Sequence, residues 1–501
     1  MNTNKAAAPQ SGTAPETAPT KGFFGHPVGL LNIFATEFCE RFSYYGMRAI
    51  LVFYLYDLTI NGGLGLSQTD AMVIMSLFGS LVYLSSIVGG WLADRVLGPF
   101  RSILVGGTTI AAGHIVLGLP LGITGTVVAM VLIILGTGLL KPNVSVMVGE
   151  LYARSDPRRQ AGFSLLYLSI NIGAFLSPLV VGSVSDSIGY HVAFIIPAVV
   201  MGLGLFVYIA LSKHTLAGVG RVPTDPLTAE SIRRIRRNVL IGLPIAALLA
   251  AVLVAAHLLG LAVISDAIPL VCALLAVALF IFLLRDKRVQ GIERNRIWAY
   301  IPLFIAATCF FAISEQQSST FPIVAKEFTD NALGAFIFPA AWYSSVNPLL
   351  IIALSPVFAL LWTKLSHRQP SMVVKIAVGL AIAALGFIVL TIGFLISGES
   401  LLSPFWLIAS LFLITTGELL LSPTGLSATS LLAPEIHLSK MMGLWFISNA
   451  LGQAINTATV RLFDGAAPEV FFMSYAFVAL AVALAIFLMR KLLLSLAGGV
   501  R

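Results

Sequence analysis

The chain has 501 residues, of which 58% are hydrophobic and 10% are charged, and its mean hydropathy is +0.96. Soluble proteins carry about 25% charged residues, so this composition excludes a soluble globular protein, which could not cover its own surface. The net charge of +8 does not indicate nucleic-acid binding, because the basic residues are spread among short loops. Long apolar runs without strand-like alternation predict an all-α polytopic membrane protein rather than a β-barrel.

The chain begins with a segment rich in Pro, Ala and Thr, which we expect to be a disordered cytoplasmic tail over residues 1–24 without a cleavable signal peptide. Fourteen apolar segments follow, each long enough to span a bilayer, for which about 20 residues suffice. In chain order, they cover residues 27–57, 70–94, 102–121, 125–150, 160–185, 190–212, 238–257, 261–284, 297–325, 336–364, 372–397, 402–432, 438–461 and 468–495.

The connections between these segments alternate in charge. The even-numbered connections carry most of the lysines and arginines, from Arg95 and Arg101 to Lys440, whereas the odd-numbered ones carry only Lys326 and Arg461. Basic loops stay in the cytoplasm, so the alternation predicts that both termini are cytoplasmic. We therefore expect a multi-pass protein of the cell inner (plasma) membrane.

The middle of the chain differs from both ends. The longest connection, 213–237, ends in the basic run RRIRR, and the two segments after it have no acid, lysine or arginine in their apolar cores. We predict that these two segments form a lipid-facing hairpin between two six-helix bundles, a layout typical of transporters whose site lies between the bundles. The predicted units are the tail 1–24, the N-terminal bundle 25–212, the linker and hairpin 213–295, the C-terminal bundle 296–496 and a tail 497–501.

The segment GGWLADRVLGPFR (89–101) joins the second and third spans. It resembles the loop signature of the major facilitator superfamily, although an ordinary positively charged turn would also explain it. The resemblance implies two six-helix bundles, here with a two-helix insertion that gives 14 transmembrane helices.

Few ionisable side chains lie inside the spans. Once the loops and tails are set aside, seven remain: Glu37, Glu40, Arg41, Arg48, Lys141, Glu315 and Glu418. Each would cost ~2.5–3.5 kcal/mol at the centre of a bilayer. We therefore expect them to line a water-filled cavity or to pair with one another, and four acids with three bases allow nearly complete pairing.

The densest cluster is the stretch EFCERFSYYGMR, residues 37–48. On a helix, one face of about 140° carries six of its side chains, Glu37, Glu40, Arg41, Tyr44, Tyr45 and Arg48. A structural ion pair between Glu37 and Arg41, one turn apart, explains part of this pattern. It does not explain the two tyrosines and Arg48 on the same face, so the stretch predicts a polar stripe that faces a cavity.

Further polar positions occur in both halves of the chain. They are Lys141 in GTGLLKPNVS, Asn171 in YLSINIGAF, Glu315 in ISEQQSST, Asn347 before Pro348, Glu418 with Ser422 one turn later, and Trp445 in MMGLWFISN. A cavity between the halves would thus be lined from both sides. His114 is either a packing residue or a group that titrates near neutral pH. No metal-ligand spacing occurs outside residues 37–48, and no phosphate-binding loop is present, so we expect no metal, no cofactor and no ATP-driven transport.

The stretch EFCERFSYYGMR resembles the ExxERFxYYG signature of the proton-dependent oligopeptide transporter (POT/PTR) family. LLKPNVS and LYLSINIGAF resemble two further family motifs, and EQQSS, GELLLSPTGLS and GLWF resemble those of the second half. The central hairpin is similar to that of the bacterial 14-helix form. The resemblance implies a monomeric symporter that imports di- and tripeptides by alternating access, with the proton as the coupling ion.

The resemblance also implies a role for each site residue. Glu37, Glu40, Arg41 and Glu315 would serve proton coupling. Substrate would be bound at its carboxyl end by Arg48 and Lys141, at its amino end by Glu418, Asn171 and Asn347, along its backbone by Tyr44, Tyr45 and Tyr83, and elsewhere by Ser422 and Trp445. Arg48–Glu315 and Lys141–Glu418 would be switchable salt bridges between the halves. The second helix lacks the histidine that animal members use in proton coupling, which leaves the glutamates as the candidates.

Two other functions were considered. A relative that transports nitrate, another anion or another small solute would favour cations without a matching acid, and Glu418 and the glutamate cluster argue against it. A membrane-embedded enzyme that uses Lys141 or Glu418 would need a nucleophile–base pair, and the sequence contains nothing that resembles one.

Overall fold

The structure is a computed structural model that describes residues 22–153, 155–228, 231, 233, 260–465 and 467–499. The described part contains thirteen helices of at least 20 residues. They are α1 (Val28–Tyr56), α2 (Gln68–Leu92), α3 (Pro99–Gly118), α4 (Gly122–Glu150), α5 (Arg159–Ser187), α6 (Tyr190–Thr215), α8 (Leu261–Arg285), α9 (Ile292–Ser314), α11 (Val346–Leu365), α12 (Met372–Ser397), α13 (Pro404–Leu431), α14 (Leu438–Thr459) and α16 (Pro468–Leu488).

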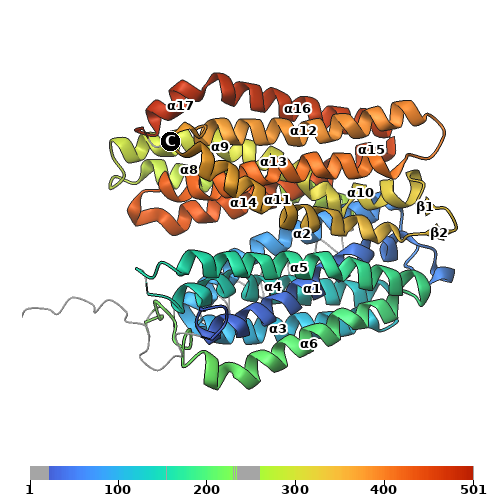
Figure 1. The fold of residues 1–501 in the computed structure, drawn as a ribbon, viewed down its shortest axis with the longest axis horizontal. Coiled ribbons are helices and arrows are strands. Elements are labelled where there is room, and N and C mark those ends of the chain that lie inside the picture. Colours follow the sequence, from blue (N-terminus) through green and yellow to red (C-terminus); the bar gives the residue numbers. More distant parts are fainter. Residues whose placement is uncertain are drawn as a thin grey trace, which may run out of the picture.

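The long helices form two groups (Figure 1). In the first group, α1 packs between α5 and α6, and α3 packs on α4 and α6. In the second group, α12 packs on α13 and α16, and α14 packs on α9. Eleven helical segments of the described chain are long and apolar enough to cross a membrane. The prediction of an all-helical polytopic membrane protein is confirmed.

The two long helices outside this set of eleven are α1 and α14. Both bury polar side chains, including Glu40 and Arg41 in α1 and Asn456 in α14. Their lower hydropathy thus reflects polar groups that face the protein interior, where other groups can satisfy them.

Of the predicted central hairpin, residues 238–257 lie outside the described residues, as does most of the predicted tail 1–24. The second hairpin helix, α8, packs along α14 and buries Cys272 and Ala276 there. Its apolar Leu270 and Leu274 are exposed, as expected for a helix that faces lipid. Near the start of α8, Asp266 pairs with Arg461 at 2.9 Å.

Three predicted spans are not continuous helices. The span 297–325 begins earlier, at Ile292, and is interrupted by the 3-10 turn η3 (Glu315–Ser318), after which α10 (Thr320–Ile323) and the π turn η4 (Val324–Phe328) follow. The Ser, Thr and Gln side chains of EQQSST compete with the backbone for hydrogen bonds, which favours such a break. The C-terminal span 468–495 ends at Leu488 and continues as a separate helix, α17 (Arg490–Leu496).

The third difference concerns the start of the span 336–364. Residues Ala332–Leu333 (β1) and Phe336–Ile337 (β2) pair as a small antiparallel hairpin, and the helical part begins only with the 3-10 turn η5 (Ala340–Ser345). Gly334 adopts φ +66°, which a tight turn requires and an L side chain disfavours. Apolar content alone therefore extended the predicted span too far.

The remaining short elements lie at the ends of the long helices. They are η1 (Thr59–Asn61), the π turn η2 (Ala93–Leu97), η6 (Ser366–Arg368), η7 (Glu435–His437) and α15 (Arg461–Gly465). The described start of the linker is attached to η2, because Asp225 pairs with Arg95 at 3.0 Å and Thr224 donates a hydrogen bond to Asp94 at 3.1 Å.

Candidate functional site

The polar stripe of α1 begins with a buried cluster of three charges. Arg41 Nε lies 2.9 Å from Glu37 Oε1 and 2.5 Å from Glu40 Oε2, and none of the three side chains is more than 5% exposed. One buried guanidinium therefore forms ion pairs with two buried carboxylates. The structure brings these residues together as the helical spacing predicted, while their role in proton coupling stays a prediction.

Tyr44 connects this cluster to the next turn of α1. The guanidinium carbons of Arg41 and Arg48 lie 5.9 Å and 6.0 Å from the centroid of its ring. The same ring stacks on Phe78 of α2 and meets Tyr45 edge to face at 5.4 Å. The Tyr44 ring thus attracts both guanidinium groups, one from each neighbouring part of the polar stripe.

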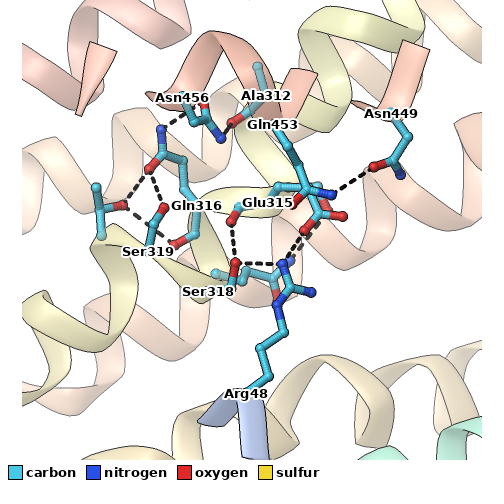
Figure 2. Close-up of polar contacts among 12 residues, drawn as sticks. Arg48, Ala312, Glu315, Gln316, Ser318, Ser319, Asn449, Gln453 and Asn456 are labelled. Atoms are coloured by element: carbon cyan, nitrogen blue, oxygen red, sulfur yellow. Dashed lines mark hydrogen bonds and ion pairs between the residues drawn. The ribbon is translucent and has the colours of Figure 1, made fainter. Parts of the chain in front are cut away.

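Arg48 reaches across to the second group of helices (Figure 2). Its Nη2 lies 2.6 Å from Glu315 Oε2 and donates to Ser318 Oγ, also at 2.6 Å. Glu315 and Ser318 both belong to η3, the turn that interrupts the predicted span. The first of the two predicted bridges, Arg48–Glu315, is therefore formed. The gating role of this bridge stays a prediction.

The acid of the second half is held by amide and hydroxyl groups. Asn347 of α11 donates from Nδ2 to Glu418 Oε2 and to Thr415 Oγ1, each at 3.0 Å. Trp445 of α14 lies nearby in the same group of helices and packs edge to face on Phe311 at 5.5 Å. A side chain at Gly425 of α13 would collide with the Trp445 ring, so this glycine is what lets α13 approach it.

The second predicted bridge is not formed. Lys141 and Glu418 both lie among the described residues, and no ion pair joins them. Lys141 Nζ instead lies 4.0 Å from the centroid of the Tyr83 ring, and Glu40 and Glu315 are among the charges that act on it. The Lys141–Glu418 bridge was predicted as a switchable one, and it stays a prediction because only one conformation is described. In this conformation the ammonium of Lys141 is held against the aromatic ring of Tyr83, and Glu418 is held by Asn347.

The cavity has a volume of about 1700 Å³ and lies between α5, α11 and α13. Its walls run from residues near the middle of these helices, such as Asn171 and Leu419, to the ends that carry Arg159 and Trp362. Asn171 donates to Tyr167 O at 2.8 Å. Ser422 is half-buried on α13, next to Pro423 of the cavity wall.

The opposite end of the molecule is closed by contacts between the two groups. Ser345 of η5 donates to Phe175 O of α5 at 2.7 Å, and Ser80 of α2 donates to Ala450 O of α14 at 2.9 Å. Together with Arg48–Glu315, these contacts join the two groups of helices. The cavity extends from Asn171 to the end where Arg159 and Lys375 lie.

The closed end also carries a group of polar contacts, which we name the Asp57 cluster: Tyr56, Asp57, Tyr190, Lys326 and Glu327. Asp57, in the loop after α1, accepts from Tyr190 at 2.7 Å and lies 3.5 Å from Lys326 Nζ. Tyr56 donates to Glu327 at 2.8 Å. Partial burial alone would raise the pKa of Asp57, but hydrogen bonds from Asn61 and Tyr190 and the Lys326 ammonium hold that pKa below its ordinary value.

Sequence reasoning missed several polar partners of the site. Ser318 and Thr415 were not singled out, nor was Asn456, which contacts η3. Polar residues spaced through the apolar α14, in SNALGQAINTAT, were the signal that could have identified Asn456. His114, left open between packing and titration, is fully buried in α3, and neither of its ring nitrogens has a partner among the described residues.

The chain is similar to proteins of a known transporter family. A profile described as PTR2, POT family, matches residues 100–489. The chain is 41% identical to a di-/tripeptide transporter of Lactococcus lactis subsp. cremoris over 96% of this chain and 98% of the relative. It is 43% identical to the uncharacterized transporter YclF of Bacillus subtilis (strain 168) over 90% of each chain.

Among solved structures, the chain is similar to a peptide transporter POT crystallised in complex with sulfate. The identity is 44%, the TM-score is 0.94, and the match covers 96% of this chain and 98% of that one. Both the profile and the relatives extend over far more than half of the sequence. The chain belongs to the POT family of transporters.

Proposed function

We propose that this protein is a proton-coupled symporter that imports di- and tripeptides by alternating access across the cell inner membrane. One observation carries the proposal: buried or half-buried charges of opposite sign come from both groups of helices. Cationic Arg48 and Lys141 lie toward the first group of helices, and Glu418, fixed by Asn347, lies in the second.

A short peptide is a zwitterion with a variable middle, so a site that accepts many peptides must bind what they share. Arg48 and Lys141 can hold the carboxylate through charge-assisted hydrogen bonds. Glu418 can hold the ammonium, with amide oxygens of Asn171 and Asn347 as further acceptors. The rings of Tyr44, Tyr45, Tyr83 and Trp445 supply apolar walls that tolerate different side chains, and Ser422 adds a hydroxyl.

The two bridges support alternating access. Arg48–Glu315 is formed, whereas Lys141 and Glu418 each have another partner, Tyr83 and Asn347 respectively. Basic loops at the cavity end assign that end to the cytoplasm, with both termini there. The conformation is then open to the inside, and rocking of the units 25–212 and 296–496 about the site would close one bridge as it opens the other.

Proton coupling follows from competition for the same cations. Glu37 and Glu40 share Arg41, and Glu315 occupies Arg48. A proton on Glu315 neutralises the carboxylate that pairs with Arg48. The guanidinium is then free to bind a peptide carboxylate. Substrate and proton together would thus open the Arg48–Glu315 pair, which we call the outer bridge. A membrane potential of about 100 mV contributes about 2.3 kcal/mol for each proton that enters.

The substrate assignment is tested by competition in proteoliposomes. Labelled dialanine uptake is measured against unlabelled peptides of two to four residues and against dialanine with a blocked amino or carboxyl end. Free di- and tripeptides should compete, whereas either blocked form should lose at least about tenfold in affinity, the loss expected for one charge-assisted contact. Competition by nitrate, or competition by both blocked forms as strong as that by free dialanine, would contradict the proposal.

A further inference from the structure

Glu315 lies on the short 3-10 turn η3, and we propose that Asn456 of α14 is the positioning residue that gives this turn the shape Arg48 requires. The proposal rests on the proposed function, in which the Arg48–Glu315 pair is the outer bridge. Asn456 touches neither Arg48 nor the cavity, and it acts through the backbone and side chains of η3.

The shape of η3 matters because Arg48 contacts two of its residues with one nitrogen. In a 3-10 helix, side chains three residues apart stand directly above one another. Glu315 and Ser318 have this spacing, and both lie 2.6 Å from Arg48 Nη2. In an α-helix, the same two residues would be offset by about 60° around the axis, which moves the hydroxyl away from the carboxylate.

Asn456 satisfies groups that the break in α9 exposes (Figure 2). The last four carbonyls of a helix have no helical partner, and Ala312 O is one of them in α9. Asn456 Nδ2 donates to Ala312 O at 3.0 Å, while Asn456 Oδ1 accepts from Gln316 Nε2 at 3.2 Å. One amide therefore connects the end of α9 to the second residue of η3.

The remaining atoms of this network are also paired. Gln316 Oε1 accepts from Ser319 at 3.1 Å and from Thr320 at 2.8 Å, and Tyr475 of α16 donates to Asn456 Oδ1 at 2.8 Å. Gln316 and Asn456 are no more than 1% exposed. A fully paired buried network of this kind is rigid, and removal of one member leaves the others unsatisfied.

The network fixes Glu315 because Gln316 is its neighbour in the chain. The Gln316 side chain is bound to α14, and the side chain of the preceding residue, Glu315, points toward Arg48 of α1, as Figure 2 shows. Without Asn456, the turn can relax, and Glu315 and Ser318 no longer meet the same nitrogen. The outer bridge is then weaker, although every residue of the bridge is still present.

The test measures a distance across the outer end. Spin labels are placed at exposed Leu58, in the loop after α1, and at exposed Ile337 of β2, with the three free cysteines replaced by alanine. Asn456→Leu and Glu315→Gln should each shift the distance distribution toward longer values. If Asn456 acts through Glu315, the double variant should show no more shift than Glu315→Gln alone. Full additivity, or no shift in Asn456→Leu, would overturn the proposal.

Two further variants keep the test decisive. Thr457→Val is the matched control: it removes a buried hydrogen bond of α14 to Ser265 O, at 2.6 Å, without touching η3, and should leave the distances unchanged. Gln316→Met cuts the same link from the other side and should reproduce Asn456→Leu, so it replaces that variant if the latter does not fold. The same shift in Thr457→Val would reduce Asn456 to an ordinary packing residue and overturn the proposal.

Transport is followed in parallel, with about a tenfold loss of proton-driven dialanine uptake expected for Asn456→Leu. The distance measurement needs no substrate. A wild-type protein that failed to transport peptides would therefore contradict the proposed function, while the distances would still decide the role of Asn456.

Discussion

Arg48 of α1 and Glu315 of η3 form an ion pair 2.6 Å long, with side chains only 12% and 14% exposed. The two residues are 267 positions apart in the sequence, and their pair joins the two groups of helices. A buried pair of this kind is costly to break by removing one partner, because an uncompensated charge is left behind. Its strength therefore depends on both partners being present, and this can be measured.

Arg48→Ala should lower the thermal stability of the purified protein strongly, by about 3–5 kcal/mol in free energy of unfolding, since Glu315 is then buried without a partner. The double variant Arg48→Ala/Glu315→Ala should recover part of the loss. Arg95→Ala is the control, because its pair with Asp225 is exposed and should contribute at most about 1 kcal/mol. A double variant less stable than Arg48→Ala would show that the two residues do not act as a pair.

Glu40→Gln and Glu37→Gln should abolish peptide uptake driven by a proton gradient yet preserve peptide counterflow at equal pH. The amides cannot carry a proton on and off, but the peptide contacts proposed for Arg48 and Glu418 remain. Both fluxes are measured in proteoliposomes with labelled dialanine. Glu327→Gln, at the exposed closed end, serves as the control and should retain driven uptake. Loss of counterflow together with driven uptake would rule out a role confined to coupling.

Glu418→Gln should raise the KM for dialanine about 10- to 100-fold, because a charge-assisted hydrogen bond to the peptide ammonium contributes roughly 1.5–3 kcal/mol. Amino-acetylated dialanine, which has no ammonium, should lose much less on the same substitution. Glu435→Gln changes an acid in the loop beyond the same helix and should leave KM unchanged. An equal loss for both ligands would place Glu418 outside the ammonium subsite.

Asp57→Asn should change uptake by the same factor at every pH between about 5.5 and 8. The pKa of Asp57 lies below its ordinary value, so its carboxylate stabilises the closed end above that ordinary value, about 3.9. The contribution is lost only as the pH falls through the lowered pKa. The check is the ratio of variant to wild-type uptake rate across this range. A ratio that varies with pH would make the Asp57 cluster a proton sensor, contrary to this account.

Much of the fold could be predicted because helix spacing and hydropathy are local properties. The stripe on α1 is an example: Glu37, Glu40 and Arg41 lie within one turn, so their contacts follow from the helix alone. The break at Glu315 was not predicted, because apolar residues continue on both sides of it. The atoms that stabilise the break come from α14 and α16, which are distant in the chain.

The state of the two salt bridges also could not be predicted from the sequence. Residue types identified Arg48, Glu315, Lys141 and Glu418 as charges inside the spans, and the family resemblance implied how they pair. Neither carries information on which side of the site is open. The structure has Arg48 paired and Lys141 against the ring of Tyr83. Which bridge is closed depends on the conformation, and therefore on how the two groups of helices pack.

The central claim is that a proton gradient drives peptide uptake through this protein. The direct measurement is accumulation of labelled dialanine in proteoliposomes that are more alkaline inside and carry a negative internal potential, compared with vesicles that have neither. The account predicts accumulation above the external concentration that collapses when a protonophore is added. Uptake that only equilibrates the two sides, or that persists unchanged with the protonophore, would contradict it.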